Sequence, residues 1–322
     1  MEKIFEQIRN IGIIPVVKID DAELASPLAK ALIAGGLPAA EVTYRTYAAE
    51  ETIKRITKEF PEMLVGAGTV INVTLAKSAI AAGAKFIVSP GFNPEVVDYC
   101  LQNKVPIIPG ISSASQVEEA LSRNITVLKL FPAEVVGGVK MIDALSGPFS
   151  QCMFMPTGGV NTENLSEYAK RKNVLAVGGT WMVKEDLING KQWQKITSIC
   201  KEAVLNLQGF AVGHIGMNAK GQDDARSFAE QFALFGYSAN EGAPSIFSGT
   251  EFEIMKGNGR GTHGHICFTV NNVDRTLYYL SKFGYKPVME TAQYMGEKEN
   301  SPMKFVYLDK DINGFAVHLK KN

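Results

Sequence analysis

The stretch Val127-Leu128-Lys129-Leu130-Phe131-Pro132 is the most informative part of this chain, because it places a lysine inside an apolar segment. Such an apolar, partly β-branched run predicts a buried strand. Burying an ammonium group without a partner is costly, and burial favours the neutral amine, which attacks a carbonyl carbon to form a Schiff base. Lys129 is therefore a candidate nucleophile. The alternative is a lysine at a strand end whose ammonium group reaches solvent or pairs with an acid.

The sequence around this stretch alternates short β-rich segments with amphipathic segments, about eight times within residues 1–207. The expected strands are Ile13–Lys18, Ala39–Thr43, Met63–Gly66, Phe86–Ser89, Pro106–Pro109, Val127–Phe131, Met153–Pro156 and Leu175–Val177. The expected helices between them include Ala22–Ile33, Ala48–Glu59, Leu75–Ala82, Pro94–Gln102, Ala114–Leu121 and Glu163–Lys170, and a further helix, Ile196–Leu207, follows the last strand. This alternation predicts an α/β fold with a parallel sheet, at the lower size limit of a (β/α)8 TIM barrel. An open doubly wound sheet is the alternative, but no GxGxxG follows the first strand.

The carboxyl ends of the expected strands carry the residues suited to chemistry, as a barrel of this kind requires. They are Glu41, Arg45, Thr69, Pro90, Lys129, Phe131, Thr157, Gly158, Gly159, Gly178, Gly179 and Thr180. The two glycine pairs follow the last two strands, and successive backbone N–H groups at helix starts there favour phosphate. The alternatives are tight turns for the glycines, an ion-paired or capping carboxylate for Glu41, and a solvated charge for Arg45.

Seven segments together resemble the 2-keto-3-deoxy-6-phosphogluconate (KDPG) / 4-hydroxy-2-oxoglutarate (KHG) aldolases over about residues 1–207. They are Glu41–Thr46, Gly66–Val70, Ser89–Gly91, Lys129–Glu134, Gly147–Gln151, Pro156–Val160 and Gly178–Trp181. The resemblance implies a class I aldolase, a lyase without a cofactor, assembled as a homotrimer. Such an enzyme cleaves KDPG to pyruvate and glyceraldehyde 3-phosphate, or KHG to pyruvate and glyoxylate.

The resemblance also implies a role for each matched residue. Lys129 corresponds to the Schiff-base lysine and Glu41 to the carboxylate that transfers protons. Arg45 and Thr69 correspond to residues that hold the carboxylate of the pyruvyl group, and Thr157 lines the reaction centre. Pro90 and Phe131 are matched as further substrate contacts. The phosphate cradle corresponds to Gly158, Gly159, Gly178, Gly179 and Thr180, where the family often has Ser in place of Thr180.

Residues 209–322 differ in character and contain an internal repeat, with modules at about 211–258 and 262–320. The segment Val212–Met217 is echoed by His263–Phe268, and Phe252–Met255 by Ala316–Leu319. A repeat of about 50 residues implies a repeated structural unit. Each copy predicts the order β-α-β-β-β, so we expect a smaller α+β domain of paired βαβββ modules after the barrel, which spans residues 1–208. This pattern resembles the glyoxalase I-like, or vicinal-oxygen-chelate, proteins.

That second resemblance implies a metal site shared by the two modules. The matching positions are His214, Glu253, His265 and His318, a ligand set that suits Zn, Ni, Fe or Mn. The last position is more often Glu in such proteins. His263, two residues before His265, is either a neighbour of the site or exposed. The alternative is a domain without metal that serves in interaction or oligomerisation.

Composition limits the partners. The 33 basic and 33 acidic residues cancel, which gives no indication of nucleic acid or an anionic membrane as partner. No apolar run approaches the roughly 18 residues of a membrane span. The four cysteines are scattered without CxxC spacing, as expected of reduced thiols in a cytoplasmic protein. Together with the resemblance to the aldolases, which implies a keto-acid substrate, this leads us to expect an enzyme that acts on a small molecule. The rival hypothesis is a non-catalytic barrel that senses pyruvate or phosphate and carries an interaction module.

Overall fold

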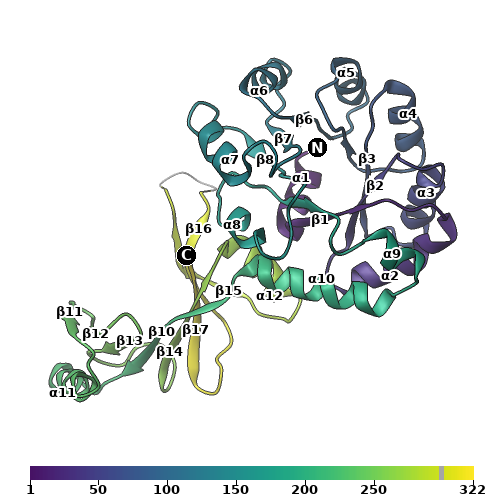
Figure 1. Cartoon of the computed structure of the whole chain (residues 1–322). Helices are drawn as coiled ribbons and strands as arrows, with labels where there is room; N and C mark the ends of the chain where they lie inside the picture. Colours follow the sequence, from purple (N-terminus) through teal and green to yellow (C-terminus); the bar gives the residue numbers. More distant parts are fainter. Residues whose placement is uncertain (297–300) are drawn as a thin grey trace. The chain divides into compact units, whose positions relative to one another are not determined.

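The computed structural model describes residues 1–296 and 301–322, and the chain divides into two compact units. The first unit comprises Met1–Leu207 and the second Gln208–Asn322 (Figure 1). No helix among the described residues is long and apolar enough to cross a membrane.

The first unit is built on a curled parallel sheet with helices outside it (Figure 1). Its strands are β1 (Ile13–Val17), β2 (Ala39–Thr43), β3 (Leu64–Gly68), β4 (Ile87–Val88), β5 (Ile107–Ile108), β6 (Gly110–Ile111), β7 (Val127–Leu130), β8 (Met153–Phe154) and β9 (Val177–Gly179). They pair in the orders β5-β4-β3-β2-β1-β9 and β6-β7-β8. Only Pro109 separates β5 from β6, and parallel bridges join Phe154 to Val174 and Thr157 to Gly178. The expected strand Pro106–Pro109 is thus two shorter ones.

The helices of the first unit follow the strands, as the sequence predicts, but three of them were not expected. They are α1 (Glu2–Ile11), α2 (Ala25–Ala34) after the short 3₁₀ turn η1 (Ala22–Leu24), α3 (Ala49–Glu59), α4 (Val73–Ala81), α5 (Pro94–Gln102), α6 (Ala114–Leu121), α7 (Gly138–Ser146), α8 (Leu165–Ala169), α9 (Glu185–Asn189) and α10 (Trp193–Gln208). Asn72 and Asn93 begin α4 and α5 by accepting hydrogen bonds from backbone N–H groups two or three residues on. The unexpected helices are α1, α7 and α9.

The central strands β1, β2 and β3 are buried along their whole length. A sheet covered by helices excludes water from both faces, which explains the apolar composition of these segments. Two charged side chains interrupt the pattern, Glu41 on β2 and Lys129 on β7, with exposed fractions of 1% and 5%. Because lone buried charges are costly, packing alone does not explain this pair, and it marks a candidate functional site.

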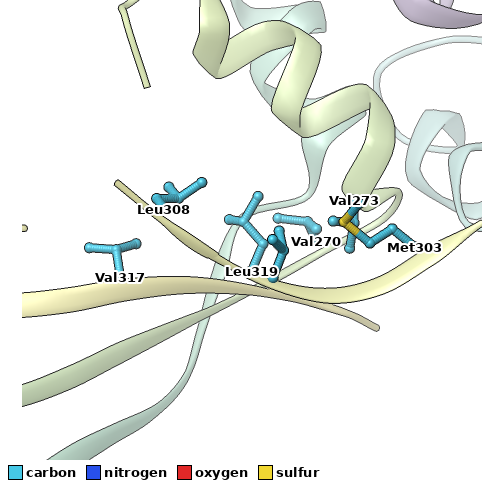
Figure 2. Close-up of a cluster of buried hydrophobic side chains, with 7 residues drawn as sticks. Val270, Val273, Met303, Leu308, Val317 and Leu319 are labelled. Carbon is cyan, nitrogen blue, oxygen red and sulfur yellow. The ribbon is translucent and has the colours of Figure 1, made fainter. Parts of the chain in front are cut away.

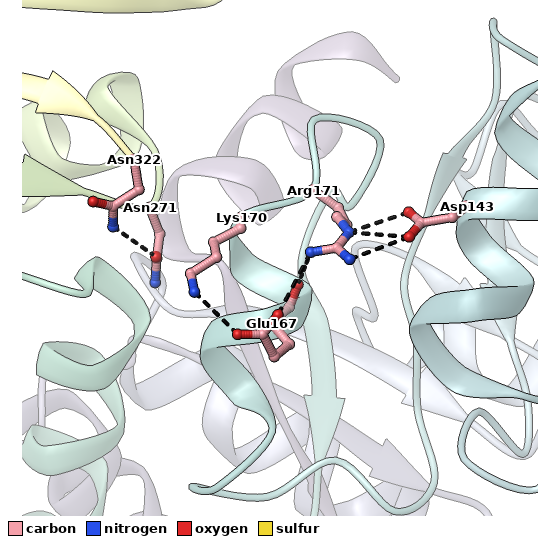
Figure 3. A network of polar contacts seen from close by, with 6 residues as sticks. All are labelled: Asp143, Glu167, Lys170, Arg171, Asn271 and Asn322. Atoms are coloured by element: carbon pink, nitrogen blue, oxygen red, sulfur yellow. Dashed lines mark hydrogen bonds and ion pairs between the residues drawn. The ribbon is translucent and has the colours of Figure 1, made fainter.

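Polar contacts on the surface contribute little to the free energy of unfolding. Figure 3 shows Arg171 between Asp143 and Glu167, and Lys170 paired with Glu167 at 3.0 Å. Exposed ion pairs of this kind contribute about 0.2–1 kcal/mol each. In the second unit the same figure shows the amides of Asn271 and Asn322 in contact.

The second unit repeats the order β-α-β-β-β. Its elements are β10 (Ala211–Asn218), α11 (Gln222–Ala233), β11 (Ala239–Glu241), β12 (Ser245–Ser248) and β13 (Phe252–Met255), then β14 (Gly264–Val270), α12 (Val273–Ser281), β15 (Pro287–Tyr294), β16 (Met303–Leu308) and β17 (Phe315–Lys321). The strands form one sheet in the order β11-β12-β13-β10-β14-β17-β16-β15. The first strands of the two repeats, β10 and β14, pair antiparallel at its centre. Each first strand also runs parallel to the last strand of its own repeat.

The two faces of this sheet differ. One face holds the apolar cores, in which α12 packs on Val317 and Leu319 of β17 (Figure 2), and α11 on Ile246 and Ile254. Successive side chains of a strand point to opposite faces. His318, between Val317 and Leu319, therefore points to the opposite face, as do the residues of the other strands that share its alternation.

Candidate functional site

Lys129 and Glu41 meet inside the first unit although 88 positions separate them in the sequence. Lys129 Nζ donates to Glu41 Oε1 at 3.0 Å, and the ring of Phe131 lies 5.3 Å from the same nitrogen. The second carboxylate oxygen, Oε2, is buried without a hydrogen-bond partner among the described residues. A buried amine and a carboxylate that lie side by side can exchange a proton, and the unused carboxylate oxygen can exchange one with a bound substrate.

Glycine makes room for this pair. A Cβ added to Gly68, on the neighbouring strand β3, would collide with the carboxylate of Glu41. Immediately after Gly68, Thr69 has a positive φ of 57° and its hydroxyl accepts from Arg45 Nε at 3.2 Å. The structure thus brings together Arg45 and Thr69, the two residues matched to carboxylate binding.

The two glycine pairs also come together. The bridge between Thr157 and Gly178 joins the segments that carry them, and a Cβ on Gly178 would collide with the Thr157 hydroxyl. Gly158 and Gly159 have φ values of 95° and 87°, which suit glycine. The expectation that the pairs lie at helix starts is wrong, because α8 begins only at Leu165 and α9 at Glu185. Gly158 and Gly159 lie in a turn, whereas Gly178 and Gly179 end β9, where the N–H of Gly178 donates to the carbonyl of Pro156 at 2.9 Å.

Two further residues lie close to this region, Pro90, which was predicted, and Glu134, which was not. Pro90 is partly buried at the end of β4, and its carbonyl packs against Gly110, where a Cβ would collide. Glu134 follows Phe131 and Pro132, and its backbone N–H donates to the carbonyl of Gly158 at 3.1 Å. The Glu134 carboxylate accepts from the hydroxyl of buried Tyr168, so the loop after β7 is fastened next to the glycines.

A cavity of about 380 Å³ opens at the ends of β1, β2 and β9. Its described lining residues are Val16, Lys18, Thr43, Arg45, Thr180, Val183, Lys184, Glu185 and Asp186. Lys129 and Glu41 are not among them. Lys18, which was not predicted to take part, pairs with Glu185 at 2.6 Å, and this hydrogen bond raises the pKa of Lys18. The sequence could have predicted this residue, because Lys18 stands at the carboxyl end of the first expected strand.

In the second unit, three of the four residues expected to bind metal, the histidines, form one group, and Glu253 contacts two of them. His214 Nε2 lies 3.1 Å from His265 Nε2 and 3.3 Å from His318 Nε2. Glu253 Oε2 lies 3.2 Å from His214 Nε2 and 3.1 Å from His265 Nε2. His263 is exposed and outside β14, so it does not belong to this cluster.

The protonation states suit a cation. Burial opposes ionisation of Glu253, but hydrogen bonds from His214, His265 and Ser245 outweigh it and hold the pKa of the carboxyl well below its usual range. Burial, and then repulsion from the other two imidazoles, lowers the pKa of His318 to about 3. A carboxylate and a neutral imidazole are the forms in which these side chains bind metals.

The spacing also suits a cation. Tetrahedral ligands with bonds of about 2.0–2.1 Å to zinc stand about 3.3–3.4 Å apart, close to the separations of this cluster. Three ring nitrogens facing one another cannot all be satisfied by hydrogen bonds among themselves, since a neutral imidazole donates from only one nitrogen. Gly216 makes room for the cluster, because a Cβ there would collide with the ring of His265. The Nδ1 atoms of His265 and His318 are buried without partners among the described residues.

Comparison with known proteins relates the first unit to a family of enzymes. A family model described as KDPG and KHG aldolase matches residues 4–199. The 2-dehydro-3-deoxy-phosphogluconate aldolase of Treponema pallidum is 48% identical over 204 residues, covering 63% of this chain and 97% of that protein. The KHG/KDPG aldolase of Escherichia coli K12 is 42% identical over 200 residues, covering 62% and 94%.

Solved structures give the same relationship. A KDPG aldolase from Legionella pneumophila, with pyruvate captured at low pH as a covalent carbinolamine intermediate, is 40% identical with a TM-score of 0.61. The match covers 62% of this chain and 97% of that one. The family match ends at residue 199, so the second unit lies outside it.

Proposed function

The chain belongs to the KDPG and KHG aldolase family and is a class I aldolase, and we propose that Lys129 forms its Schiff base with the keto acid. The observation that carries this assignment is the buried contact of 3.0 Å between Lys129 Nζ and Glu41 Oε1. A lysine that forms an imine must lose a proton, and a hydrogen-bonded carboxylate beside it can accept one.

In the proposed mechanism the neutral amine of Lys129 adds to the C2 carbonyl of the substrate to give a carbinolamine. Loss of water leaves an iminium, which withdraws electrons from the C3–C4 bond. Glu41 removes the proton of the C4 hydroxyl, the bond breaks, and the aldehyde leaves. The remaining enamine takes a proton from Glu41 at C3, and water then releases pyruvate from Lys129. The free Oε2 of Glu41 supports this role, since a base needs an unused oxygen.

The other matched residues are proposed to hold the substrate. Arg45 and Thr69 bind the carboxylate of the pyruvyl group, for which a guanidinium fork is suited. Pro90, Phe131 and Thr157 line the reaction centre. The distal phosphate binds at the cradle formed by Gly158, Gly159, Gly178, Gly179 and Thr180. Backbone N–H groups in turns with positive φ can form anion-binding concavities, which supports the part of this placement that rests on Gly158 and Gly159.

The substrate is proposed to be KDPG, KHG or both. A product assay with each compound tests this proposal. If the phosphate cradle is used, kcat/KM for KDPG exceeds that for KHG, and equal values favour a KHG specialist. Failure to release pyruvate from either compound, despite binding, would favour the non-catalytic sensor.

We further infer that the curled sheet closes as an eight-stranded barrel, with β5 and β6 forming one interrupted strand. The bridges from Phe154 and Thr157 to the segment before and within β9 support closure. A homotrimer is proposed from the family resemblance alone, and light scattering tests it. Four buried free cysteines support a reducing, cytoplasmic location.

For the second unit, we propose a glyoxalase-like domain of paired βαβββ modules that binds one divalent metal. His214, Glu253, His265 and His318 would hold it. The ligand atoms of the three histidines all lie within 4.8 Å of one another, and Glu253 contacts two of them at 3.1 and 3.2 Å, which supports this. When bound, Zn, Ni, Fe or Mn supplies Lewis-acid chemistry. Elemental analysis of the purified full chain tests the proposal. A chain without stoichiometric metal would favour an interaction module.

A further inference from the structure

One arginine beside the histidine cluster is held in place by its neighbours. Arg260 lies on the connection between β13 and β14. The amide of Asn218, at the end of β10, accepts from the N–H of Gly259 at 3.0 Å and donates to the carbonyl of Gly261 at 2.9 Å. One side chain therefore fixes the backbone on both sides of Arg260. Gly261, with a φ of 76°, has no space for a Cβ, so this connection is tightly packed.

One aromatic ring, that of Tyr307, lies between the side chain of Arg260 and the histidine cluster. Its guanidinium carbon lies 5.1 Å from the centroid of the Tyr307 ring. The Tyr307 ring in turn lies 4.9 Å from the His318 ring and 6.1 Å from the His265 ring, measured between centroids. Tyr307 and His318 are cross-strand partners, so their side chains share one face of the sheet. The arginine thus stands at the edge of the face that carries the proposed metal ligands.

The charge of Arg260 is not neutralised within the described part of the chain. No carboxylate of residues 1–296 or 301–322 forms an ion pair with it, and the side chain is exposed. Lys256, four residues earlier, differs in that it pairs with Glu241 at 2.8 Å, and Arg226 pairs with the same carboxylate at 3.1 Å. Among residues 1–296 and 301–322, the guanidinium of Arg260 thus has no carboxylate partner.

The total charge of the site favours an anion. Three neutral imidazoles, one carboxylate and a divalent cation carry a net charge of +1, and Arg260 raises it to +2. The same face is lined by apolar rings, with Phe305 at 4.6 Å from His318 and Phe247 at 5.6 Å from His214 between ring centroids. A small organic anion with a short apolar part would pair with the positive charge and pack against these rings.

We propose that this face binds a small carboxylate ligand, with Arg260 holding the carboxylate while a second oxygen of the ligand reaches the metal. The inference rests on the metal site proposed above for the second unit. Asn218 acts as a positioning residue, because it fixes Arg260 without facing the ligand itself. A 2-oxo acid has the required pair of oxygen functions, so pyruvate is a suitable probe and pyruvamide, its uncharged analogue, is the matched control.

The test uses the full chain loaded with Co²⁺, whose visible absorption changes when a ligand enters the metal's coordination. This signal follows the coordination of the ion itself, and Lys129 is not one of the proposed metal ligands. Pyruvate should change the spectrum with saturation, and Arg260→Gln should weaken its binding about 10- to 100-fold, as expected for loss of a charged hydrogen bond. Asn218→Ala should weaken it less. Pyruvamide should bind weakly and equally to the parent and Arg260→Gln chains.

Arg226→Gln is the control, because it removes an arginine of the same unit that pairs with Glu241. It should leave pyruvate binding unchanged. An unaltered spectrum of ligand-free Co²⁺ in Arg260→Gln shows that the metal ligands are intact. Equal affinity for pyruvate in the parent and Arg260→Gln chains, with Co²⁺ bound, contradicts the role of Arg260 alone. Failure to bind Co²⁺ at all overturns the metal site and this inference with it.

Discussion

The Glu41 carboxylate fills the space next to Gly68, where a Cβ on that residue would collide with it. The glycine on β3 is therefore part of the arrangement that lets Glu41 of β2 reach Lys129 of β7. A larger residue at position 68 must push the carboxylate away from the amine. The proposed proton-transfer group and the space it needs thus come from adjacent strands.

Glu41→Gln should slow cleavage by about 10²–10⁴-fold with a modest change in KM, because the amide keeps the shape but cannot act as a base. The same variant should slow the exchange of pyruvate methyl protons with solvent, which NMR follows directly. Gly68→Ala should act in the same direction through displacement of Glu41. Unaltered methyl exchange in Glu41→Gln would refute the assigned role.

Added divalent metal should stabilise the second unit, by about 2.7 kcal/mol when free metal is 100 times the dissociation constant. Calorimetry should show this as a raised unfolding temperature, which His265→Ala should abolish. Both tryptophans, Trp181 and Trp193, lie in the first unit, so their fluorescence should report an unchanged transition there. Aldolase turnover should be unaffected by His265→Ala. A metal effect that survives this substitution counts against the ligand set.

Acid should destabilise the metal-free second unit. The pKa of His318 is lowered from 6.5 to about 3, so as pH falls below about 6.5 the unfolded chain binds a proton that the folded chain does not. The contribution of His318 to the free energy of unfolding is complete above pH 6.5 and is lost as the pH falls towards 3. The low pKa of Glu253 acts in the same direction below its ordinary value of 4.5.

All four histidines lie in the second unit, so their ring signals in NMR follow this unit alone. In chelator-treated protein, less urea should be needed to unfold it at pH 5 than at pH 7, and the His318 ring should remain neutral at pH 5. His318→Gln should reduce the difference between the two pH values. A His318 ring that gains its proton near pH 6.5 in the folded chain would contradict this account.

The sequence predicted the elements whose ends carry clear signals. The helices Pro94–Gln102 and Ala114–Leu121 have the predicted bounds, and Asn93 with Pro94 shows why, since a capping side chain precedes a proline in the first turn. Helix α7 was missed because it begins at Gly138, directly after Gly137, and glycine disfavours helix. The helix α1 was missed although Ile8 and Ile11 give it a buried side.

The sites were predictable to different degrees. Lys129 stood out because a charged side chain interrupts an apolar strand, whereas the four proposed metal ligands were predicted from the resemblance to the glyoxalase I-like proteins. Arg260 could not be found in this way, since it lies in a connection and its proposed role rests on its contact with the ring of Tyr307, 47 positions away (307 − 260). Contacts between a loop and a distant strand depend on the tertiary fold, which local patterns do not encode.

The most direct test of the central claim is reductive trapping of pyruvate. Borohydride added to the full chain with pyruvate should reduce the iminium and leave a stable mass increase, which peptide mass spectrometry should place on Lys129. Lys129→Ala should lose the adduct and nearly all turnover, and Lys129→Arg should not restore them because arginine stays protonated. A trapped adduct on another lysine, or an active enzyme that yields none, would contradict the assignment of Lys129.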